Sequence, residues 1–185
     1  MKVLFVLGLA FASIISFASP APRAKGRQES VSVKQIANAL KVSLLAEKRR
    51  YKRDDHIKLQ AMLVNYKDHD VFVYGILDWG YSASFTLHVR DAKGKDIRSR
   101  FFDDALTPPL TPDDTSPFVK LLQHHFLGTY YYSTIHELNM EKPGRYNIFV
   151  EYHCPISAAD IKLSPFWGKE NGTIRSNVVW VEVGP

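Results

Sequence analysis

Cysteine is almost absent from this chain of 185 residues, because Cys154 is the only one. A single cysteine allows no disulfide within the chain, so packing alone has to hold the fold together. Its position has the same parity as Tyr146, Ile148, Val150 and Tyr152, which predicts a side chain that points into the core as a small hydrophobe. A reactive thiol or an intermolecular bridge is the alternative.

The motifs of common active sites and metal sites are also missing. The sequence has no G-x-S-x-G, no glycine-rich phosphate loop, and no H-x-x-x-H, H-x-H or C-x-x-C spacing. The seven histidines include the adjacent pair His124-His125, which suits neither a helical nor a strand pair of ligands. We therefore predict a protein that is not an enzyme and that has no cofactor and no metal site.

Only one long hydrophobic run is present, at residues 3–17, and it follows the positive charge of Lys2. Ser16-Phe17-Ala18 is a small-x-small cleavage site, so the pattern predicts a signal peptide at 1–18. The run is shorter than the roughly 20 apolar residues of a spanning helix. We expect export to the periplasm or the outside of the cell, and no membrane span after cleavage.

The rest of the chain divides into two parts. Residues 19–38 begin rich in proline, glycine, serine and arginine and predict a flexible leader, and 39–185 predict one domain. Residues 116–122, Ser-Pro followed by Phe118, Leu121 and Leu122, predict a short amphipathic helix. Strands are expected at 40–44, 57–65, 70–75, 85–89, 97–102, 128–140, 145–154 and 178–183, with 70–75 apolar enough to be central. Seven to eight short strands and almost no helix predict an all-β, antiparallel sandwich.

One turn and the strand after it favour an immunoglobulin-like (Ig-like) sandwich. Pro143-Gly144 stands just before Tyr146, and the following residues alternate between apolar and polar. A tyrosine at this place bonds its hydroxyl to the backbone of the preceding corner, an arrangement called the tyrosine corner. We expect the bond near residues 140–143.

Three segments resemble secreted bacterial Ig-like domain proteins: FTLHVRDAKGKDI, LNMEKPGRYNIFVEY and GTIRSNVVWVEV. The resemblance covers about residues 40–183 and extends distantly to fibronectin type III domains and to bacterial intracellular proteinase inhibitors. Antibody-type domains place a cysteine two residues after the corner tyrosine, where this chain has Ile148. The resemblance therefore implies an Ig-like core without a disulfide, and it transfers no function.

The basic run Lys48-Arg49-Arg50-Tyr51-Lys52-Arg53 raises the question of a polyanionic partner. Asp54 and Asp55 follow it directly, and alternation along a strand end divides its charges between two faces. We interpret it as a solvated hairpin and expect no nucleic-acid partner.

Four aromatic residues in two loops are the candidate partner-binding residues: Trp79, Tyr81, Phe166 and Trp167. Tryptophan and tyrosine are typical anchors of binding sites in loops. The competing interpretation, which we favour, is that the two tryptophans fill the ends of the core. The sequence thus predicts an exported, non-enzymatic binding or accessory module with an unidentified protein or glycan partner and an undetermined oligomeric state. The alternative is a proteinase inhibitor that uses loops at one end of the sandwich.

Overall fold

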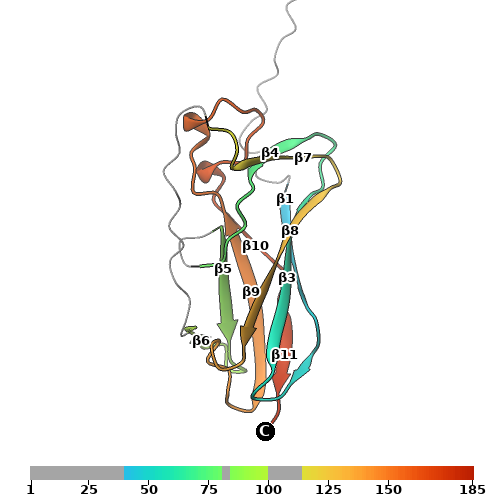
Figure 1. Ribbon diagram of the computed structural model, residues 1–185, viewed down its shortest axis with the longest axis vertical. Coiled ribbons are helices and arrows are strands. Elements are labelled where there is room, and N and C mark those ends of the chain that lie inside the picture. The colour runs from blue at the N-terminus through green and yellow to red at the C-terminus, as the bar shows by residue number, and fades with distance from the viewer. Residues whose placement is uncertain (1–39, 81–83, 100–113) are drawn as a thin grey trace, which may run out of the picture. The chain divides into compact units, whose positions relative to one another are not determined.

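The computed structural model describes residues 40–80, 84–99 and 114–185, and they contain eleven strands and two short 3-10 helices (Figure 1). The expectations for the signal peptide, the leader, Tyr81 and residues 100–113 lie outside this part of the chain. The elements are β1 (Leu40–Ala46), β2 (Arg50–Tyr51), β3 (His56–Asn65), β4 (Val71–Tyr74), β5 (Phe85–Arg90), β6 (Asp96–Ile97), β7 (Phe118–Leu121), β8 (Phe126–Thr134), β9 (Gly144–His153), η1 (Ala158–Asp160), η2 (Lys169–Asn171), β10 (Thr173–Arg175) and β11 (Val179–Val183).

Two sheets form the sandwich. The smaller sheet has the order β1-β3-β8 and is antiparallel throughout. The larger sheet has the order β2-β11-β9-β5-β6, with β10 also paired to β9. Its strands are antiparallel except for β2, which runs parallel to β11. The basic run is therefore more than a solvated hairpin, because its residues Arg50 and Tyr51 cross to the larger sheet as β2.

Residues of both sheets meet in one hydrophobic core. The alternate positions of β3, from Ile57 to Leu63, are fully buried, and those of β9 from Tyr146 to Tyr152 are buried as well. Cys154 continues the β9 pattern with 1% of its surface exposed, which confirms the predicted inward orientation. The protein is an all-β, Ig-like sandwich without a disulfide, as the sequence predicted.

Two local predictions were wrong. Residues 71–74 are not central in either large sheet, because β4 forms a separate two-stranded sheet with β7, and a single parallel bridge joins Phe72 to Phe166. Residues Phe118–Leu121 are that partner strand rather than a helix. Four residues gain few helical hydrogen bonds, whereas pairing with β4 satisfies backbone groups of both segments, so the tertiary contact overrides the local helix signal.

The strand predicted at 128–140 ends earlier, at Thr134. The Glu137 carboxylate accepts hydrogen bonds from the Thr134 amide at 2.9 Å and from the Ser133 hydroxyl at 2.6 Å, which turns the chain. These bonds, the Ser133 bond first, lower the pKa of Glu137. No helix within the described ranges is long and apolar enough to cross a membrane.

Candidate functional site

Two of the predicted binding residues lie inside the core. Trp167 has no exposed surface and Phe166 has 4%. Their segment continues the edge of β4, because the Trp167 amide donates to the Phe72 carbonyl at 2.9 Å and the Phe72 amide donates to the Pro165 carbonyl at 2.8 Å. Side chains without exposed surface offer no contact to a partner, so the structure does not support a binding site at Phe166 and Trp167.

Trp79 is half-buried and begins a series of aromatic contacts that ends at Trp167. Its ring lies 5.2 Å from that of Phe85, Phe85 lies 5.5 Å from Tyr152, and Tyr152 lies 5.3 Å from Trp167. The two tryptophans are thus linked through buried rings, which agrees with the interpretation that they fill the core. Tyr81 lies outside the described residues.

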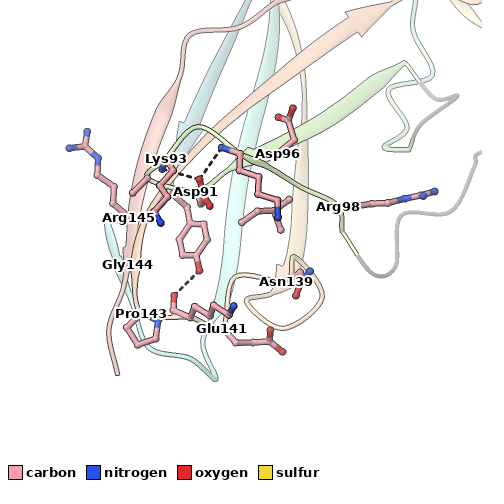
Figure 2. A pocket seen from close by; sticks show the side chains of 14 residues that line it. Asp91, Lys93, Asp96, Arg98, Asn139, Glu141, Pro143, Gly144 and Arg145 are labelled. Carbon is pink, nitrogen blue, oxygen red and sulfur yellow. Dashed lines mark hydrogen bonds between the residues drawn. The ribbon is translucent and has the colours of Figure 1, made fainter.

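A pocket of about 460 Å³ opens beside the tyrosine corner, between the β5–β6 turn and residues 139–146 (Figure 2). The Tyr146 hydroxyl donates to the Lys142 carbonyl at 2.7 Å, which confirms the tyrosine corner that the sequence predicted. Burial raises the pKa of Tyr146, so the phenol keeps its proton and the bond at neutral pH. The charged residues of the lining are Asp91, Lys93, Lys95, Asp96, Arg98, Glu141, Lys142 and Arg145.

Each acidic side chain that lines this pocket makes a hydrogen bond or an ion pair with another residue of the chain. Asp91 accepts from the amides of Lys93 and Lys95, each at 2.9 Å, and this closes the β5–β6 turn. Asp96 pairs with Arg90 at 2.7 Å, and that bond lowers the pKa of Asp96. Glu141 bonds His136. The pocket is therefore a structural corner and not a paired-carboxylate active site.

Other chemistry finds no support in the described residues. They contain no group of three or more histidine, cysteine, aspartate or glutamate side chains placed to hold a metal ion. Burial raises the pKa of Cys154 to about 11, which makes its thiol a poor nucleophile at neutral pH.

The outward surface of the β1-β3-β8 sheet carries a second candidate site, which we call the aromatic face. It is defined by the outward residues of the three strands: Lys41, Ser43, Leu45, His56, Lys58, Gln60, Met62, Val64, Phe126, Gly128, Tyr130, Tyr132 and Thr134. Cross-strand register places Leu45, Gln60 and Tyr130 in one row, and a hollow of about 270 Å³ lies beside them.

Aromatic rings dominate this face. Phe126, Tyr130 and Tyr132 expose 61%, 58% and 66% of their surface, although all three belong to one strand of a packed sheet. His56 stacks on Tyr132 at 5.1 Å, and the Lys58 ammonium lies 4.7 Å from the centre of the Tyr130 ring. These tyrosines belong to the strand expected at 128–140, for which the sequence predicted no binding role. The spacing of Phe126, Tyr130 and Tyr132, at positions of equal parity, is the signal that identifies one outward row.

Comparison with known proteins shows no family for this chain. No protein-family model and no curated protein sequence matches the chain. Solved structures that resemble it include the CARDB domain of a Pyrococcus furiosus protein in complex with di-metal ions, with 11% identity, a TM-score of 0.37, and coverage of 78% of this chain and 87% of that one. An alkylpurine DNA glycosylase from Pseudomonas fluorescens has 11% identity and a TM-score of 0.39, over 83% of this chain and 32% of the glycosylase. A beta-glucosidase from Listeria innocua has 11% identity and a TM-score of 0.36, over 79% of this chain and 16% of the enzyme. Similarity at this level transfers no activity.

Proposed function

We propose that this protein is an exported, non-enzymatic binding module that docks a protein partner on its aromatic face. The observation that supports this best is the exposed row of Phe126, Tyr130 and Tyr132. Contiguous exposed apolar surface on a soluble domain marks an interaction site, and tyrosine and phenylalanine are enriched at the centres of protein interfaces.

The charge of the face specifies the chemistry of the partner. Lys41, Lys58 and His56 point outward from β1 and β3, and the outward residues of the three strands include no carboxylate. Glu47, which follows β1, stands at the edge of the hollow. A second copy of the chain would bring lysines against lysines, so the expected partner presents carboxylates around an apolar centre.

The interface needs little rearrangement on this side. Tyr130 and Tyr132 are anchored by Lys58 and His56, so part of the entropy of ordering their side chains is already lost in the free protein. Tyrosine is also a rigid anchor, with two side-chain torsions and both apolar and polar contact surface. The side chains of the aromatic face are therefore largely ordered before a partner binds.

Export rests on the predicted signal peptide at 1–18. The proteinase-inhibitor alternative depended on aromatic residues exposed in loops. Phe166 and Trp167 are buried, so that alternative loses its main support.

The test begins with photo-crosslinking in the cells that make the protein. A photoreactive amino acid replaces Tyr132 in one variant and Lys162, an exposed residue between β9 and β10, in the control. The crosslinked partner is then purified, and its affinity is measured for the wild type, for Tyr130→Ala with Tyr132→Ala, and for Lys162→Ala, which lies in the segment between β9 and β10.

We expect the adduct only from position 132, and the double variant should bind about a hundredfold more weakly, because buried interface tyrosines contribute up to a few kcal/mol each. Lys162→Ala should bind like the wild type, and added salt should weaken binding. Absence of an adduct at position 132, an adduct with a second copy of the chain, or unchanged affinity of the double variant would overturn the proposal.

A further inference from the structure

The outward side of the larger sheet carries arginines stacked on aromatic rings. The guanidinium carbons of Arg49 and Arg145 lie 4.9 and 4.7 Å from the centre of the Trp180 ring. Arg49 also donates to the Trp180 carbonyl at 2.9 Å. Trp180, which alternates with the buried Val179 and Val181, keeps 38% of its surface exposed.

A second cluster surrounds Phe149 on the neighbouring strand. Arg175 lies 3.6 Å and Arg90 5.0 Å from the centre of its ring, and His88 stacks on it at 4.6 Å with the rings nearly parallel. Phe149 is only 2% exposed although it points outward, because these side chains cover it.

The two clusters form one surface. In the register of the sheet, Asn147 lies between Trp180 of β11 and Arg90 of β5, and Phe149 lies opposite His88. We call this surface the arginine face and define it by Arg49, Arg50, His88, Arg90, Arg145, Phe149, Arg175 and Trp180. Arg145 and Phe149 are four residues apart on β9, which is roughly 13 Å along an extended strand.

Carboxylates are present on this face: Glu151 pairs with His88 at 3.4 Å, and Glu182 and Glu151 lie opposite Arg145 and Arg175 in the register of the sheet. Arg50 pairs with Glu182 at 3.4 Å and Arg90 pairs with Asp96 at 2.7 Å. Among the described residues, Arg145 and Arg175 form no ion pair within 4.0 Å and both are exposed. The guanidinium group is a planar fork of N–H donors that matches the two oxygens of a carboxylate or sulfate.

We propose that the arginine face binds an acidic polysaccharide through the carboxylate or sulfate groups of successive sugar units. The guanidinium groups are spread over a distance longer than one anionic group can span. This spread favours a polymer over a small ion. Trp180 and the half-exposed Val178 offer an apolar surface against which a sugar ring can lie between the charges.

The proposed contact is the surface of a paired sheet and not a free strand edge. The strand β9 pairs with β5 on one side and with β10 and β11 on the other. An added peptide strand therefore has no backbone groups to pair with at the centre of the face. We therefore expect a partner whose backbone needs no hydrogen bonds to a strand and whose side groups carry the charge. A glycan has both properties.

The test uses the mature full-length chain with heparin as a sulfated probe and polygalacturonate as a carboxylated probe, by calorimetry at about 0.15 M salt, where weak nonspecific attraction is screened. One variant combines Arg145→Gln with Arg175→Gln. The matched control combines Lys162→Gln with Lys169→Gln, which removes the same charge from exposed positions between β9 and β10. A third variant combines Arg145→Lys with Arg175→Lys and keeps the charge.

We expect the arginine-to-glutamine variant to bind at least about tenfold more weakly, because two charge-assisted, bidentate contacts are lost. The lysine control should stay within about twofold of the wild type, and the arginine-to-lysine variant should fall between them, since lysine lacks the planar fork. Thermal unfolding of each variant checks that the fold is intact.

Three outcomes would overturn the proposal. The first is equal weakening in the arginine-to-glutamine variant and the lysine control, which would mean that only net charge matters. The second is the absence of binding to both polysaccharides. The third is binding of polyglutamate as tightly as polygalacturonate with the same dependence on Arg145 and Arg175, which would assign the face to acidic peptides.

Discussion

The side-chain amide of Asn177 binds both backbone groups of Leu44. Its oxygen accepts from the Leu44 amide at 2.8 Å, and its nitrogen donates to the Leu44 carbonyl at 3.0 Å. Leu44 lies in the middle of β1, an edge of the smaller sheet, whereas Asn177 lies between β10 and β11 of the larger sheet. One side chain thus takes the place of a neighbouring strand and connects the two sheets at this edge.

This relationship gives a structural role to the segment GTIRSNVV, which is one of the segments on which the resemblance to Ig-like domains rests. Ser176 precedes the asparagine, accepts a hydrogen bond from the Val150 amide at 3.0 Å and donates to the Asn177 carbonyl at 2.7 Å. The Ser-Asn pair therefore holds the break between β10 and β11 and ties it to β1.

Replacing Asn177 with alanine should lower the free energy of unfolding by about 1–2 kcal/mol, because two hydrogen bonds are lost and the site is partly open to water. Asn177→Asp should also destabilise, since a carboxylate has no donor for the Leu44 carbonyl. Urea unfolding followed by fluorescence measures both effects. Val178→Ala, at the exposed neighbouring position, should change stability by less than about 0.5 kcal/mol, and an equal loss in this control would show that the Asn177 contact is not special.

Removing the hydroxyl of the corner tyrosine tests the hydrogen bond that the sequence predicted. Tyr146→Phe should lower the free energy of unfolding by about 0.5–1.5 kcal/mol, because the Lys142 carbonyl loses its donor while the ring stays packed. Tyr132→Phe removes a hydroxyl from the exposed aromatic face and should leave stability unchanged in the same urea experiment. Equal values for the two variants would contradict the role assigned to Tyr146.

The corner was predictable because its cause is local in sequence. Pro143-Gly144, Tyr146 and the alternation of β9 lie within about ten residues, and Gly144 has a φ of 152°, which favours glycine. The helix expected after Ser116 failed for the opposite reason, since its alternative partner, β4, lies about 45 residues earlier in the chain.

The arginine face could not be predicted either, because it depends on contacts between segments that are far apart in the sequence. Strand parity predicts that Phe149 points outward, and it does. Its burial depends on Arg90 and Arg175, which come from different strands, and the sequence contains no sign that their positions converge. The single buried thiol, by contrast, could be placed from parity alone because the strand that carries it is regular as far as His153.

The buried thiol makes stability depend on alkaline pH. The pKa of Cys154 is raised from an ordinary 9.0 to about 11 in the folded protein, mainly by burial, so the folded state holds its proton where the unfolded state has released it. Its contribution is fully present below about pH 9 and is lost as pH rises to about 11, with a total of at most about 3 kcal/mol. Buried tyrosines act in the same direction at higher pH, so the comparison is with Cys154→Ala, whose stability should fall less between pH 8.5 and pH 10.5. Parallel curves would mean that the thiol is more accessible than the structure shows.

The last prediction separates the core tryptophan from an exposed aromatic residue. Trp167→Ala removes a fully buried side chain that contacts Tyr152, and it should lower the free energy of unfolding by about 3–5 kcal/mol. Trp167→Phe should cost clearly less, because phenylalanine fills most of the space and the Trp167 Nε1 has no hydrogen-bond partner within the described part of the chain. Tyr66→Ala, with 57% of its surface exposed, provides the control and should change stability little. If Trp167→Ala kept the stability of the wild type in urea unfolding, the ring would have to be exposed in solution, and a loop-based binding site would again become the better hypothesis.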